Sequence, residues 1–129
     1  MQRSAELGQS IVALTDRDGL YAAVRWVREC SRLGIRPVLG VDIAVEATQA
    51  ARVHPDVQAR TPARGGRWID ETRPRVLLLA TGSRGWASLC RLVSAAHIGD
   101  HTVRGEPWVP WSALREHSEG IVVILGADS

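Results

Sequence analysis

Four short apolar segments, separated by helix-like stretches and polar turns, constrain the fold of this chain more than any other feature. They span residues 11–15, 37–45, 76–80 and 121–125. Short runs that are apolar at nearly every position are typical of strands buried on both faces of a parallel sheet. The sequence therefore predicts an α/β domain with mostly parallel strands.

The stretch between the first two segments predicts the crossover helix of a βαβ unit. Within residues 20–33, apolar side chains such as Val24, Val27 and Cys30 recur at three- and four-residue spacings, and Gly34 follows as a stop signal. The arginines of this stretch lie largely outside the apolar stripe. A strand–helix–strand unit of this kind pairs its strands in parallel, with a right-handed connection.

Three further helices are predicted, one before the first strand and two beside the later strands. Residues 1–8 have the pattern of a helix end, residues 84–96 of a helix capped by Ser83, and residues 113–117 of a short helix capped by Ser112. Residues 46–74 are predicted to form a long irregular insertion, because they are rich in Ala, Arg, Thr, Pro and Gly. Its bulky anchors are Trp68 and Ile69.

Length and composition exclude several classes of protein. A chain of 129 residues fits one domain or part of one. No apolar run approaches the roughly 18 residues that a membrane helix needs, and the first residues lack a signal-peptide pattern, so we expect a cytoplasmic protein with no membrane partner. Cys30 and Cys90 are expected to be free buried thiols rather than a disulfide.

Charge is unevenly distributed along the chain. The 16 basic residues are all arginine, against 14 acidic residues. Residues 52–91 hold eight arginines and three acids, whereas residues 92–129 hold two arginines and five acids. The basic stretch, residues 52–91, could favour anionic partners, although a solvated surface is the preferred interpretation.

Candidate site residues gather at the predicted strand ends. Asp16, Asp18 and Asp42 could converge and bind a hard divalent cation such as Mg²⁺ or Mn²⁺. Asp residues also cap helices and fill turns, and that interpretation is preferred. The four histidines lie in loops or at helix ends, where a metal site of this fold would not place them: His54, His97, His101 and His117.

Two tryptophans offer a second candidate site. Trp108 and Trp111 flank Pro110 and could form a stacking platform for nucleic-acid bases. Anchoring of the loop onto the core is the preferred interpretation. The sequence contains no phosphate-binding glycine loop and no nucleophile elbow.

Several stretches together resemble a known family. Residues 13–20, ALTDRDGL, are similar to the second strand and turn of a PHP domain (polymerase and histidinol phosphatase), and residues 37–42, PVLGVD, to the strand that follows it. Residues 85–97, GWASLCRLVSAAH, resemble a segment of the bacterial C-family DNA polymerases, of the DNA polymerase III alpha or error-prone type. Residues 119–126 resemble the next strand of those polymerases.

The resemblance implies a distorted (β/α)7 barrel with a metal cluster at the carboxyl ends of its strands. Residues 1–129 would then form a single partial PHP domain, with the N- and C-terminal parts of the full domain outside this sequence. The chain departs from the family pattern where metal ligands are expected. Arg17 and Arg75 stand where the family has histidines, Asp42 replaces a glutamate and Ala127 a cysteine, while Asp16 precedes the first departure.

These departures argue against metal binding by this segment. Arginine stays protonated and has no lone pair to donate, and two fixed cations would repel a divalent ion. We therefore expect no metal ligands, no catalytic residues and no cofactor here, and assign no nucleic-acid-binding residues. Arg17 could instead bridge Asp16, Asp18 or Asp42, so that ion pairs replace the metal.

The function that the resemblance implies belongs to a longer parent chain. The parent would be a DNA-directed DNA polymerase, a nucleotidyltransferase that uses Mg²⁺ in replication or error-prone repair. This segment would be a metal-free structural scaffold. Its partners would be the rest of the polymerase chain, DNA through the parent, and other replisome subunits. The alternatives are a stand-alone PHP-type metal-dependent phosphoesterase and a truncated, non-catalytic binding module.

Overall fold

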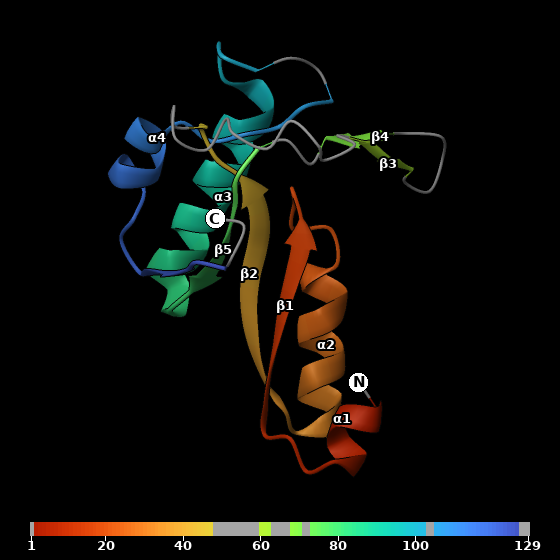
Figure 1. The fold of residues 1–129 in the computed structure, drawn as a ribbon. Coiled ribbons are helices and arrows are strands. Elements are labelled where there is room, and N and C mark those ends of the chain that lie inside the picture. Colours follow the sequence, from red (N-terminus) through yellow and green to blue (C-terminus); the bar gives the residue numbers. More distant parts are fainter. Residues whose placement is uncertain (1, 48–59, 63–67, 71–72, 103–104, 127–129) are drawn as a thin grey trace.

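A four-stranded sheet with helices packed on it forms the body of the protein in this computed structural model (Figure 1). The structure describes residues 2–47, 60–62, 68–70, 73–102 and 105–126. In the sheet, the strands are arranged in the order β1 (Ile11–Arg17), β2 (Arg36–Ala44), β5 (Arg75–Ala80) and β6 (Ile121–Ile124). Two short strands, β3 (Arg60–Pro62) and β4 (Trp68–Asp70), pair separately within the predicted insertion. The helices are α1 (Gln2–Glu6), α2 (Ala23–Leu33), α3 (Gly82–Ile98) and α4 (Trp111–Glu116).

The predicted βαβ unit is confirmed. β1 and β2 pair in parallel, from Ile11 beside Arg36 to Arg17 beside Asp42, and α2 connects them. α2 ends at Gly34, whose φ of 69° is the left-handed conformation that glycine adopts without strain. The local signals that predicted this unit, a periodic helix between two apolar runs, were therefore sufficient.

The prediction of mostly parallel strands is wrong, because the sheet is mixed. β2 and β5 pair antiparallel, as do β5 and β6. β5 begins where β2 ends: the Val45 N–H donates to the Pro74 carbonyl at 2.9 Å. α3 then returns the chain toward the start of β5, and the connection through α4 carries it back to the end of β5, so β6 runs opposite to β5 (Figure 1).

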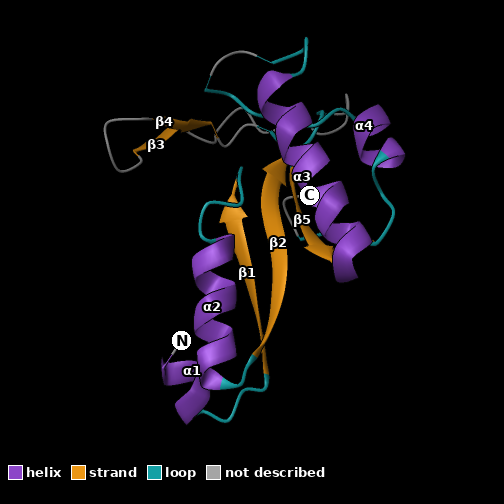
Figure 2. Ribbon diagram, turned by 180° about the vertical axis from the view of Figure 1, so that it is seen from behind, coloured by secondary structure: helices purple, strands orange, loops and turns teal. Residues whose placement is uncertain are grey.

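The core lies on one face of the sheet. Val41 and Ile43 of β2 and Leu78 of β5 pack against Leu89 and Leu92 of α3, and all five are completely buried. α2 lies on the same side of the sheet. Asp16 is the neighbour of Val41 in the β1–β2 register, and its side chain accepts a hydrogen bond from the N–H of Ala22, the residue before α2. Seen from behind, α2 runs alongside β1 and α3 alongside β5 (Figure 2).

The outermost strands are more exposed than their apolar sequences predicted. Val122, Val123 and Ile124 of β6 are each between 42% and 46% exposed, and Ile11 of β1 is 45% exposed. β1 and β6 are the two edges of the sheet in the described part of the chain. Burial on both faces is therefore confirmed for neither strand.

The predicted helix caps also differ from those observed. α3 begins at Gly82 after Thr81, and α4 at Trp111 after Pro110, so Ser83 and Ser112 lie inside their helices. The Thr81 hydroxyl donates instead to the Gly120 carbonyl at 2.9 Å, which ties the start of α3 to the start of β6. A tertiary contact thus holds the start of α3.

Both thiols are free, as predicted, although Cys30 is buried and Cys90 only half-buried. In the described residues, no helix combines the length and apolarity needed to cross a bilayer.

Candidate functional site

Three of the residues that depart from the family pattern, Arg17, Asp42 and Arg75, meet on the sheet face opposite the helices. Arg17 and Asp42 are neighbours in the β1–β2 register, and Arg75 lies beside Ala44 at the start of β5. These positions alternate with the buried Val41 and Ile43, so their side chains emerge on the other face. Antiparallel pairing of β5 with β2 therefore brings a residue 33 positions away in the chain to Asp42.

Arg75 is the centre of this cluster. Its Nε donates to Oδ1 of Asp42 at 2.8 Å, and its Nη2 donates to Oδ1 of Asp18 at 2.7 Å. The same Nη2 donates to the backbone carbonyl of Asp42 at 2.8 Å. Arg75 is 17% exposed, and the two carboxylates are 21% and 28% exposed. A planar guanidinium offers several fixed donors, which suits it to hold two carboxylates at once.

Of the three ion pairs that the sequence offered for Arg17, the structure shows the one to Asp18. Its ion pair to Asp18 is long, with Nε 3.7 Å from Oδ2. Its Nε and Nη2 atoms are buried and have no hydrogen-bond partner. Arg75 takes the bridging role, because the β5 register places it between Asp18 and Asp42.

Asp16 belongs to a different contact. Its Oδ2 accepts a hydrogen bond from the Ala22 N–H at 2.7 Å, which fixes the turn into α2. Asp16 therefore faces the helix, whereas Asp18 and Asp42 bind Arg75. The three carboxylates do not converge on one point, so that prediction is wrong and the preferred role of Asp16 in a helix start is confirmed.

His97 of α3 contacts the turn that holds Asp18, and sequence reasoning missed this contact. Its Nε2 lies 2.6 Å from the carbonyl oxygen of Asp18. Asp18 has a φ of 55°, and its N–H donates to the Asp42 carbonyl at 2.8 Å. The left-handed turn at Asp18 aims its carbonyl at α3. Asp-Gly at positions 18 and 19 signals such a turn, but nothing local places it beside residue 97.

The donor set does not fit a metal ion. In the described residues, no group of three or more His, Cys, Asp or Glu side chains is arranged to hold one. The carboxylates of Asp18 and Asp42 point to the guanidinium of Arg75, whose fixed positive charge takes the place that a cation would need. Ala127 lies outside the described residues.

The two tryptophans differ in their surroundings: the Trp108 ring contacts its neighbours, and Trp111 is 37% exposed. The Trp108 ring packs edge-on against His101, at 4.4 Å between centroids, and the Arg73 guanidinium lies 4.6 Å above it. His101 Nε2 also contacts the Trp108 carbonyl at 3.0 Å. These contacts hold the Trp108 ring against residues 73 and 101, and anchoring of the loop onto the core stays a prediction. Trp111 starts α4, and its N–H donates to Glu46 at 3.3 Å.

Comparison with known proteins assigns the family. The model of the PHP domain matches residues 1–129. The chain belongs to the PHP domain family. It is 34% identical over 120 residues to an error-prone DNA polymerase of Mycobacterium tuberculosis, which covers 93% of this chain and 10% of that protein.

Two further relatives show the same pattern. The chain is 29% identical over 123 residues to a DNA polymerase III subunit alpha of Caulobacter vibrioides, and 33% identical over 134 residues to an error-prone DNA polymerase of Anaeromyxobacter sp. strain K. Those matches cover 95% and 98% of this chain but only 9% and 10% of the polymerases. The PHP chain thus spans about a tenth of the length of these relatives.

Proposed function

We propose that this chain is the PHP region of a bacterial DNA polymerase of the DNA polymerase III alpha or error-prone type, in which it acts as a metal-free structural scaffold. The observation that carries the scaffold role is the bridge from Arg75 to Asp18 and Asp42. A half-buried guanidinium between two carboxylates ties the turn after β1 to β2 and β5 without a metal. The names and coverage of the relatives support the polymerase context.

The uncovered sheet face supports a place in the distorted (β/α)7 barrel. Leu77 and Leu79 of β5 share this face with Val122 and Ile124 of β6, and both β6 residues are exposed. The described sheet has two edges, β1 and β6, at which further strands could pair. In a closed barrel, this face would be the interior.

Nucleotide transfer with Mg²⁺, replication or repair, a cytoplasmic location, and contacts with DNA and other replisome subunits would belong to the polymerase as a whole. Among the residues that the structure describes, no group of three or more His, Cys, Asp or Glu side chains is arranged to hold a metal ion. The test of this context is the coding sequence on both sides of the segment. A polymerase module in frame downstream supports the proposal, and stop codons at both ends would leave only the truncated binding module.

The metal-free role is tested on the purified chain by elemental analysis and by melting with added Mn²⁺, Zn²⁺ or Mg²⁺. We expect less than stoichiometric metal and an unchanged melting temperature. Stoichiometric bound metal, with EDTA-sensitive hydrolysis of a phosphate ester, would instead establish the phosphoesterase alternative.

A further inference from the structure

A line of four side chains follows the outer side of α2 and of the turn before it. Tyr21, Arg25, Arg28 and Arg32 are spaced by four, three and four residues. At 3.6 residues per turn, the three arginines fall within about 60° of one another around the axis of α2, and Tyr21 lies in the turn before the helix. The buried Ala23 and Cys30 of α2 lie on the opposite side, toward the sheet. The four residues, named here the outer line of α2, therefore face solvent in the described structure.

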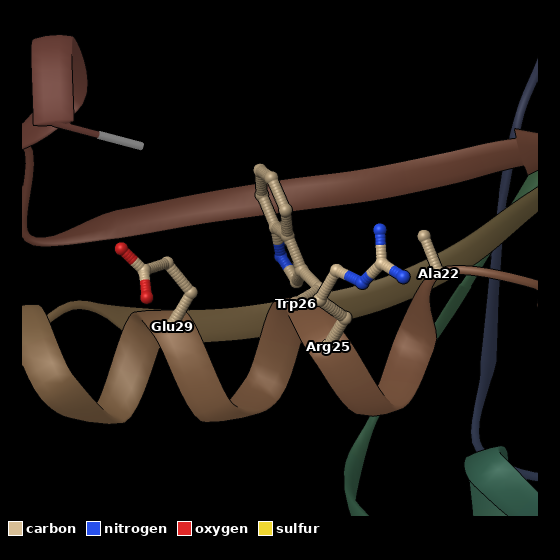
Figure 3. Close-up of a pocket in the computed structure, with 4 residues that line it drawn as sticks. All are labelled: Ala22, Arg25, Trp26 and Glu29. Atoms are coloured by element: carbon tan, nitrogen blue, oxygen red, sulfur yellow. The ribbon is translucent and has the colours of Figure 1, made fainter.

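The outer line carries excess positive charge. Residues 20–36 contain four arginines and one acidic residue, Glu29. Glu29 binds Arg32, with Nη2 to Oε1 at 2.6 Å. Figure 3 shows the Glu29 carboxylate and the Arg25 guanidinium pointing in opposite directions along the hollow that they line with Ala22 and Trp26. Arg25 and Arg28 are exposed, and no described carboxylate lies within ion-pair distance of them.

Tyr21 adds an open aromatic ring to this line. Tyr21 is 78% exposed, more than any other aromatic residue in the described part of the chain. Its ring rests on Gly19: a Cβ added there would overlap the ring carbons Cδ2, Cε2 and Cζ. One side of the ring is thus supported by backbone, and the rest is open to solvent. A ring held in this way loses little conformational freedom when a flat partner stacks on it.

We propose that the outer line of α2 binds single-stranded nucleic acid. Arg25 and Arg28 would bind phosphates of the backbone, and Tyr21 would stack on a base. Neighbours three or four residues apart on a helix have Cβ atoms roughly 5–6 Å apart, so the two guanidiniums can track one strand. Unpaired arginines combined with an open aromatic ring are the elements of single-strand binding. An acidic protein would meet the same arginines, and the competition experiment below separates it from a nucleic acid. This inference goes beyond the scaffold role and does not depend on it.

The charge contribution is tested by fluorescence anisotropy of the chain with a labelled oligothymidine over a series of salt concentrations. The double variant Arg25→Gln/Arg28→Gln should bind at least about tenfold more weakly at low salt. Its log K against log[salt] slope should be shallower by about 1.4, since each lost phosphate contact removes about 0.7 for single strands. The matched control is Arg91→Gln/Arg115→Gln, which removes two exposed arginines from α3 and α4 and should leave the slope unchanged.

The stacking contribution has its own variants. Tyr21→Ala should weaken binding to oligothymidine by about fivefold or more, whereas Tyr21→Phe, which keeps the ring, should bind like the wild type. An abasic oligonucleotide should bind the wild-type and Tyr21→Ala chains equally. Equal losses in the two double variants, no measurable binding at low salt, equally tight binding of duplex DNA, or competition by polyglutamate as strong as by oligothymidine would each overturn the proposal.

Discussion

The Arg75 guanidinium holds Asp42 through both the side chain and the backbone, since Nε binds Oδ1 and Nη2 binds the carbonyl oxygen, each at 2.8 Å. The Arg75→Gln variant removes these bonds and leaves two half-buried carboxylates facing each other. Hydrogen bonds to charged groups contribute about 1.5–3 kcal/mol each to stability. After allowance for partial solvent screening, we expect a loss of roughly 2–3 kcal/mol in the free energy of unfolding, measured by urea titration.

The matched control is Arg84→Gln. Arg84 also pairs with a carboxylate at 2.7 Å, that of Glu119, but both side chains are largely exposed, at 80% and 69%. Exposed ion pairs contribute little to stability. The free energy of unfolding of Arg84→Gln, measured by the same urea titration, should therefore be nearly that of the wild type. A comparable loss of stability in both variants would show that the half-buried ion pairs of Arg75 contribute no more than an exposed one.

Arg17 should respond to substitution in the opposite sense. Two of its nitrogen atoms are buried without hydrogen-bond partners, and its ion pair with Asp18 is 3.7 Å long. Burying unsatisfied donors is unfavourable, and an apolar side chain of similar length removes that penalty. Arg17→Met should therefore melt at the same temperature as the wild type or higher in differential scanning calorimetry. A loss as large as that of Arg75→Gln would restore Arg17 as the bridging residue.

The contrast between Arg17 and Arg75 shows how far the sequence could predict the site. Both positions were identified as departures from the family pattern, and the β1–α2–β2 unit that holds Arg17 followed from local periodicity. The partner of Asp42 did not follow, because it depends on the antiparallel register of β5, which residues 46–74 separate from β2. The contact between His97 and Asp18 joins residues 79 positions apart and has no local signal either.

Exposure of the edge strands has a similar origin. An apolar run such as Ile121 to Ile124 predicts a strand correctly, but it does not specify what covers each face. For the outer line of α2, the sequence showed only that its arginines lie outside the apolar stripe of the helix. Its meaning depends on which arginines are paired, and that requires the geometry of Glu29 and Arg32.

Gly40 permits the close packing beside the Arg75 cluster. A Cβ at this position would lie 2.5 Å from the Leu78 carbonyl, 2.6 Å from Cδ2 of Leu79 and 3.0 Å from Cγ2 of Thr15. The backbone oxygen cannot move without disturbing the β2–β5 pairing. Gly40→Ala should therefore lower the free energy of unfolding by about 1–3 kcal/mol, as overpacking does.

A double-mutant cycle tests the origin of that loss by urea titration. Leu79→Ala removes the methyl group that the new Cβ would meet, but leaves the Leu78 carbonyl in place. Gly40→Ala should consequently be less destabilising in the Leu79→Ala background than alone. Strictly additive effects would indicate that the Leu79 side chain does not restrict this position.

The two cysteines should differ in reactivity and in their effect at alkaline pH. Cys30 is completely buried, and burial raises the pKa of its thiol above the ordinary value of 9.0, whereas Cys90 is half-buried. Folded protein should react with a thiol reagent such as dithionitrobenzoate rapidly at Cys90 and slowly at Cys30, and both should react rapidly in urea.

Because the folded state holds the Cys30 proton more tightly than the unfolded state, this group does not affect stability well below pH 9. It lowers stability as the pH rises above that value. Urea titrations at pH 8 and pH 10 should show a smaller loss of stability for Cys30→Ala than for the wild type, and an equal loss in both would contradict the assignment.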